Sequence, residues 1–309
     1  MVSSLRQIGF CAIALAVTLR PTTAAEAQKT SPPLVENGSG ALDARVHHEL
    51  EGFKGKVCLY AKNLDTGATY SLNGEERVRT ASTIKAAIMV EAFARVAEER
   101  SKWTDEIILT KEKKQPDGGV LQEFADNTRL TLRDAVNLMI VLSDNTAANL
   151  VIDTVTTDAV NARMDSLGLP KTRSLGKIGG GAYSKARLDP VNQGKGIGVT
   201  TPHEMVALLE KLERGEVINP AASAEMIALL KREQFHEGIT RGLKNVEAAT
   251  KCGSLDALRA DIGVIYSPRG RIAMAIYCDD MPEIDYTLDN PALLLMSRLS
   301  TILIEGLGR

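Results

Sequence analysis

The sequence lacks any apolar run long enough to cross a membrane, and it lacks an excess of charge of either sign. The apolar stretch Ile8–Val17 holds ten residues, about half of the roughly 20 that a membrane helix needs. The net charge is −2, and removal of residues 1–27, which contain Arg6, Arg20 and Glu26, leaves about −3. This charge balance lacks the excess of positive charge that binds nucleic acid or an anionic membrane surface, so we expect neither as a partner.

Cysteine and histidine are also scarce, which leaves little basis for disulfides or a metal site. Cys11 lies in the apolar stretch, so three cysteines remain beyond it: Cys58, Cys252 and Cys278. Three cysteines allow at most one disulfide within the chain, and we interpret Cys58 and Cys278 as small buried hydrophobes of strands. The four histidines show no zinc-protease spacing. We expect no metal and no cofactor.

The start of the chain has the pattern of a secretory signal. Arg6 precedes the apolar stretch, and Ala25-Glu26-Ala27 is a cleavage site of small residues. We therefore expect a signal peptide over 1–27, a flexible tail over 28–40 and export to the periplasm or the medium. An uncleaved anchor is the alternative. The mature chain is long enough for one domain or two packed lobes, and we expect a monomer.

Strand patterns cluster at both ends of the sequence, and helical patterns fill the middle. The segment 168–200 differs from both, since it holds eight glycines and little periodicity, and a loop of this length is usually a functional lid or a disordered segment. A capping box with proline at the first position restarts a helix at Thr201. Helices are expected at 41–53, 82–97, 131–142, 150–155 and 291–307, and strands at 57–62, 68–72, 260–266 and 272–277.

Three short motifs stand in one order along the chain. They are Ser82-Thr83-Ile84-Lys85, Ser143-Asp144-Asn145 and Lys251-Cys252-Gly253, separated by 61 residues from Ser82 to Ser143 and by 108 from Ser143 to Lys251. Each motif alone is weak, because Ser174-Leu175-Gly176-Lys177 also has the S-x-x-K form. The order and spacing together indicate a serine acyl-transfer site.

In this combination the sequence resembles the S-x-x-K, S-D-N and K-T-G signatures of class A β-lactamases and penicillin-binding proteins. The resemblance covers residues 56–306 and implies an α+β fold in which an antiparallel sheet is flanked by helices and carries an inserted all-helical lobe. It predicts one catalytic domain over 41–309, with a sheet lobe at about 41–80 and 215–309 and a helical lobe at about 81–214.

Ser82 and Lys85 form the expected nucleophile and base. A serine hydroxyl is a weak nucleophile at neutral pH and needs a base within hydrogen-bond distance. Residues three apart share one face of a helix, and a lysine acts as a base when burial or a positive neighbour, here Lys251, lowers its pKa. Ser82 also starts its helix, where free N–H groups favour an oxyanion. A plain helix-start serine is the alternative.

The resemblance assigns the remaining roles. It casts Ser143 as a proton shuttle, and Asn145 as a ligand of the substrate amide that also orients Lys85. Lys251 is implied to bind a substrate carboxylate, Gly253 lets its strand approach the ligand closely, and the Ser254 N–H is implied as an oxyanion donor. Without the resemblance, Ser143 is a loop serine and Asn145 a helix cap.

Two positions depart from the pattern or have a competing interpretation. Cys252 replaces the usual Thr or Ser, and since a thiol is a weaker donor we expect weaker binding of penicillin-like carboxylates. An alternative interpretation is that Cys252 is itself a nucleophile, because Lys251 beside it could lower the pKa of the thiol. Arg259 either adds affinity for a carboxylate or is a surface arginine.

The largest departure is the missing loop glutamate of class A enzymes. The nearest match to R-x-E-P-x-L-N is Arg187-Leu188-Asp189-Pro190-Val191-Asn192, with Asp in place of Glu and with Asn192 one residue early. The segment 179–181 lies closer to the expected place. In one interpretation, Asp189 is the base that activates water. Its side chain is one methylene shorter than that of glutamate, and a displacement of about 1 Å can lower the reaction rate about 100-fold. In the other interpretation, Asp189 is a turn residue.

Three functions share this machinery. The first is a class A-like β-lactamase that hydrolyses the β-lactam amide through an acyl-enzyme at Ser82. The second is a peptidoglycan D-alanyl peptidase or esterase, and the third is a sensor that stays acylated. The expected partner is thus a small β-lactam or a peptidoglycan-derived molecule.

Overall fold

The computed structural model describes residues 40–308. The expected signal peptide over 1–27, and all of the expected tail except Gly40, lie outside this range. No helix within the described range combines the length and the apolar character needed to span a membrane.

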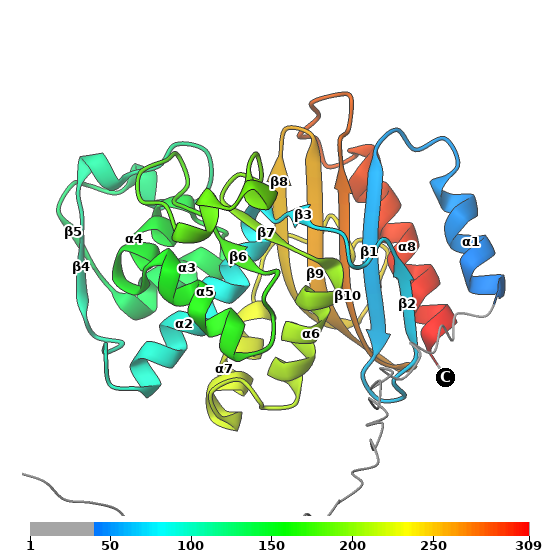
Figure 1. Cartoon of the computed structure of the whole chain (residues 1–309), viewed down its shortest axis with the longest axis horizontal. Helices are drawn as coiled ribbons and strands as arrows, with labels where there is room; N and C mark the ends of the chain where they lie inside the picture. Colours follow the sequence, from blue (N-terminus) through cyan, green and yellow to red (C-terminus); the bar gives the residue numbers. More distant parts are fainter. Residues whose placement is uncertain (1–39, 309) are drawn as a thin grey trace, which may run out of the picture. The chain divides into compact units, whose positions relative to one another are not determined.

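A five-stranded antiparallel sheet organises the fold, in the order β2-β1-β10-β9-β8 (Figure 1). It is built from both ends of the chain, as the strand patterns predicted, and antiparallel hairpins join β1 to β2, β8 to β9 and β9 to β10. Strand β8, which carries the Lys251-Cys252-Gly253 motif, is an edge strand. The strands are β1 (Lys56–Asn63), β2 (Thr69–Leu72), β8 (Glu247–Leu255), β9 (Leu258–Ser267) and β10 (Gly270–Asp279).

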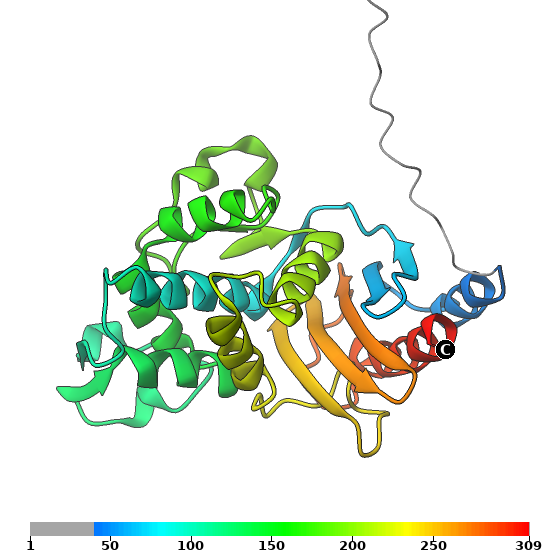
Figure 2. The ribbon, with the colours of Figure 1, turned by 90° about the horizontal axis from the view of Figure 1, so that it is seen from below.

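Helices cover both faces of this sheet, because successive strand residues point to opposite sides. On β10, Ile272, Met274, Ile276 and Cys278 belong to the core shared with α1 (Gly40–Leu50) and α8 (Pro291–Leu307), which lie together on one face (Figure 2). The intervening residues, including Tyr277, face a second core that also contains α6 (Pro202–Glu213). Cys58 and Cys278 are buried, as expected, and both are free thiols, which the sequence did not decide.

Helix α2 (Lys85–Ala97) is the centre of the helical lobe. Its residues from Lys85 to Ala94 are all buried, because α2 contacts α3, α4 and α5 as well as the turn before it. Thr131 and Asp134 form the capping box that starts α3. The lobe's other helices are α3 (Leu132–Val141), α4 (Asn145–Val155) and α5 (Thr157–Ser166). Helix α7 (Pro220–Leu230) comes later in the chain and packs against strand β8.

The α+β fold class is confirmed. The segment 168–200 is more structured than expected, because its glycines with positive φ turn the chain sharply between short elements. It contributes β6 (Arg173–Ser174) and β7 (Gly198–Thr200) to a small sheet with β3 (Val78–Arg79). A separate hairpin pairs β4 (Glu106–Leu109) with β5 (Thr128–Thr131).

Candidate active site

Ser82 lies in a 3₁₀ turn, Ala81–Ile84, that leads directly into α2. This differs slightly from the expected α-helix over 82–97, since the first turn is tighter and Ala81 has a positive φ of 45°. A non-glycine residue in this region is uncommon and is held by its surroundings. Ser82 is half-buried, and within the described range its hydroxyl makes no hydrogen bond, so the oxygen is open to a reactant.

Lys85 follows one helical turn later and is completely buried. Its Nζ donates to the Ser143 carbonyl oxygen at 2.5 Å and to Asn145 Oδ1 at 2.8 Å, and it lies 3.3 Å from Ser143 Oγ. Burial and then the positive charge of Lys251 lower the pKa of Lys85 to about 7. A substantial fraction of Lys85 is therefore neutral near pH 7 and able to accept a proton.

The Ser143-Asp144-Asn145 motif joins the site to the loop 114–121. Asp144 caps α4 by accepting from Ala147 N at 2.8 Å, and its second oxygen accepts from Val120 N at 2.7 Å and Leu121 N at 2.9 Å. Asn145 holds the same loop, since its own N–H donates to the Gly118 carbonyl. Asp144 thus stabilises the loop, and Asn145 and Ser143 hold Lys85.

Strand β8 packs directly against the backbone of Ser82. A Cβ added to Gly253 would lie 2.8 Å from Ser82 N and 3.0 Å from Ala81 Cβ, so only glycine allows this approach. The Cys252 N–H leaves the sheet edge to reach Glu233, and every second N–H of a strand points to the same side. The Ser254 N–H therefore also points out from the edge, beside the Ser82 backbone.

A buried ion pair that was not predicted lies beneath this strand. Lys251 Nζ donates to Glu233 Oε1, and both side chains are 0% exposed. Burial lowers the pKa of Lys251, but the Glu233 carboxylate outweighs it and raises the pKa above its ordinary value. Glu233 follows α7 with no local motif around it, so nothing in the sequence distinguishes it from a surface glutamate.

Cys252 and Arg259 lie on the same face of the sheet, and Cys252 contacts this ion pair. Burial raises the pKa of the Cys252 thiol despite the nearby charge of Lys251, which disfavours the thiolate that a Cys252 nucleophile requires. The Arg259 guanidinium donates to the carbonyl oxygens of Leu255 at 2.6 Å and Leu258 at 2.7 Å, and to that of Asp285. Its role toward a substrate carboxylate stays a prediction.

The loop places Asp189 differently from the expected base. Asp189 is exposed and accepts from Val191 N at 3.1 Å, so it caps the short turn Pro190–Asn192. The loop is instead fastened to α4 by Asn149, whose amide bonds both the N–H and the carbonyl of Ile178 at 2.9 Å. The fastened segment, 177–181, carries no carboxylate. Sequence reasoning missed Asn149, although it lies one helical turn after Asn145.

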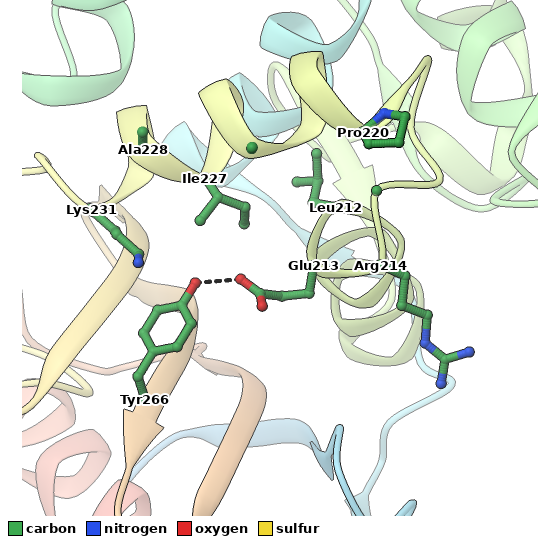
Figure 3. A pocket seen from close by; sticks show the side chains of 10 residues that line it. Leu212, Glu213, Arg214, Pro220, Ile227, Ala228, Lys231 and Tyr266 are labelled. Atoms are coloured by element: carbon green, nitrogen blue, oxygen red, sulfur yellow. Dashed lines mark hydrogen bonds between the residues drawn. The ribbon is translucent and has the colours of Figure 1, made fainter.

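A separate cavity of about 440 Å³ lies among the end of α6, helix α7 and strand β9 (Figure 3). Glu213 points into it and accepts a hydrogen bond from the Tyr266 hydroxyl, and Lys231 lies over the Tyr266 ring at 4.2 Å. No motif residue lines this cavity. Within the described chain there is also no cluster of His, Cys, Asp and Glu side chains able to hold a metal.

The chain is similar in sequence and fold to known proteins of one family. Residues 41–307 match the Beta-lactamase enzyme family. The structure is similar to a β-lactamase from Sphaerobacter thermophilus, with 28% identity, a TM-score of 0.75 and coverage of 86% of this chain and 96% of that one. No curated protein sequence matches the chain.

Two more distant structures share the fold. PBP-A is 24% identical with a TM-score of 0.73, covering 86% of this chain and 95% of that one. A class A β-lactamase from Mycobacterium abscessus is 21% identical with a TM-score of 0.74, covering 85% and 98%.

Proposed function

Because this chain belongs to the β-lactamase enzyme family and is a serine hydrolase of the β-lactamase type, we propose that Ser82 opens β-lactam amides to form an acyl-enzyme. One observation carries the proposal: Lys85 is buried one turn from Ser82, is held by Ser143 and Asn145, and has a pKa near 7. A base whose pKa lies near the working pH is the most effective in proton transfer.

Acylation then proceeds in two stages, the attack of Ser82 on the carbonyl carbon and the loss of the leaving nitrogen. Neutral Lys85 takes the Ser82 hydroxyl proton as Oγ attacks the lactam carbonyl carbon. The Ser82 and Ser254 N–H groups stabilise the oxyanion. As the carbonyl re-forms, the C–N bond breaks and Ser143 delivers a proton to the leaving nitrogen, replacing its own proton from Lys85. The product is an ester at Ser82, and Lys85 returns to its neutral form.

Deacylation requires a water that a base activates, and the loop offers little support for it. Asp189 is exposed and caps a turn, and the segment fastened to α4 has no carboxylate. We therefore propose that water clears the acyl-enzyme slowly. The same observation also favours the other two candidates. A peptidoglycan D-alanyl peptidase or esterase does not require the loop glutamate, and a sensor that stays acylated does not require it either.

The function is tested by an intact-mass time course of the protein with excess benzylpenicillin. We expect one adduct, located at Ser82 and persisting for longer than about an hour, because the segment fastened to α4 in the described chain carries no carboxylate to activate water. Ser82→Ala should show none, whereas Ser174→Ala, in the other S-x-x-K match, should label normally. An adduct that appears and decays within seconds as product accumulates would contradict slow deacylation, and labelling of Ser82→Ala would contradict the assigned nucleophile.

Asp189→Ala is expected to leave the decay of the adduct unchanged within about twofold, because the carboxylate caps Val191 N and a cap acts on local stability. The measurement is the rate of adduct loss after removal of free drug. Asp189→Asn, which retains the capping acceptor, is the matched control. A tenfold or larger slowing in both variants would restore Asp189 as the base.

Export to the periplasm or the medium as a monomer, after removal of residues 1–27, belongs to the same proposal. It is supported by the charged start, the apolar stretch and the small-residue cleavage site. The intact mass of the exported protein tests the cleavage point.

A further inference from the structure

The Lys251 ammonium already has an ionic partner inside the protein. Its partner Glu233 is equally buried, and the same carboxylate accepts the Cys252 N–H at 2.9 Å and 3.2 Å from its two oxygens. One acidic side chain therefore holds both the lysine and the strand that flanks Ser82. A substrate carboxylate brought toward Lys251 would also approach the negative charge of Glu233.

The other candidate anchors for a carboxylate are also weak. Arg259 is 2% exposed, gives its terminal nitrogens to backbone carbonyls and stacks on Tyr286 at 4.6 Å. Asp256, which accepts from the Tyr286 hydroxyl at 2.7 Å, places a further negative charge beside it. Cys252 supplies a thiol where a hydroxyl donor would bind an anion more strongly.

The surface beyond the edge strand combines apolar side chains with the carboxylates of Glu237 and Asp261. A cavity of about 250 Å³ begins at Cys252, Gly253 and Ser254. Among its other lining residues, the apolar and aromatic side chains are those of Phe235, Tyr286, Leu288 and Leu293. An ionised group placed there would lose hydration without a free cationic partner, which is unfavourable. An uncharged group would lose little hydration and gain apolar contact.

We propose that Glu233 is a positioning residue that makes this site select acyl donors with no free carboxylate on the leaving side. The favoured class is esters, amides and lactams whose leaving portion is uncharged. This inference rests on acylation of Ser82, the proposed function. A repulsive element aimed at one substrate class is a recognised route to specificity, and Glu233 supplies it through Lys251.

The test compares two donors that differ only in the charge, benzylpenicillin and benzylpenicillin methyl ester. The rate of Ser82 acylation is measured by intact mass at matched concentrations. With the wild-type protein we expect the methyl ester to react at least about tenfold faster. In Glu233→Gln, which removes the buried carboxylate that repels an incoming anion, the ratio should shift at least about tenfold toward the free carboxylate.

Glu247→Gln is the matched control. Glu247 also pairs with a lysine, Lys231 at 2.9 Å, and lies on β8, the strand of Lys251, but the pair is partly exposed. The ester preference should stay within about twofold of the wild-type value. An equal shift in both variants would show that diffuse charge controls the preference and would overturn the role of Glu233.

The wild-type ratio decides the inference even if Glu233→Gln folds poorly, which circular dichroism would reveal. Faster acylation by the free carboxylate in the wild type overturns the inference and leaves the proposed function intact. Absence of labelling at Ser82 by both donors refutes the proposed function itself, and the inference with it.

Discussion

Replacing Lys85 by methionine is expected to lower the rate of Ser82 acylation by about 10²–10⁴-fold, the usual contribution of a general base. Lys85 is completely buried, and its ammonium nitrogen lies within hydrogen-bond distance of Ser143 and Asn145. Methionine keeps a similar length and apolar stem but cannot take a proton. The measurement is the second-order rate constant for adduct formation with each donor.

The pH dependence of the same rate tests the mechanism more closely. Burial and Lys251 lower the pKa of Lys85 to about 7, and only the neutral amine accepts the proton. The rate should therefore be level above about pH 7 and fall about tenfold for each unit below it. Lys85→Met should lose this dependence together with the rate.

Lys177→Met is the control, because Lys177 completes the other S-x-x-K match and pairs with Asp153 on α4. It should retain both the rate and the pH profile. A Lys85→Met variant that acylates at more than a tenth of the wild-type rate would exclude Lys85 as the base.

Replacing Gly253 by alanine is expected to lower acylation by about 10²–10³-fold, the cost of losing one oxyanion donor. The added Cβ would lie 2.8 Å from Ser82 N and 3.1 Å from the Thr80 carbonyl oxygen, and both are backbone atoms. Strand β8 must therefore move away from Ser82, which carries the Ser254 N–H out of position. The measurement is the acylation rate, with the melting temperature as a check on folding.

Gly40→Ala provides the comparison, because nothing lies within 4 Å of a Cβ at that position. It should acylate as the wild type does. If Gly253→Ala reacts at the wild-type rate with a normal melting temperature, β8 does not form the oxyanion site.

Features that depend on neighbours along the chain were predictable. Ser82 and Lys85 are three residues apart, so helical geometry alone brings them to one face. The capping box at Thr131 and the strands around the turn 267–270 depend on similarly local patterns. The order of the motifs, through the family resemblance, also predicted the α+β fold, which the structure confirms.

Features that depend on the path of a loop were not predictable. Asp189 matched the expected pattern better than any other residue of the loop, yet its carboxylate caps its own turn. The loop segment that is fastened to α4 is instead the one around Ile178, whose backbone is hydrogen-bonded by the Asn149 side-chain amide. A linear motif carries no information about which loop atoms satisfy a buried amide.

The sequence by itself determined the fold class and the placement of Ser82 and Lys85 one helical turn apart, because helix periodicity and motif spacing are properties of the linear chain. Only the tertiary structure decided the electrostatics of the site. The pKa of Lys85 depends on the exclusion of water and on the charge of Lys251, which is itself paired with Glu233. Burial and distance control such interactions, and both exist only after distant segments have packed together.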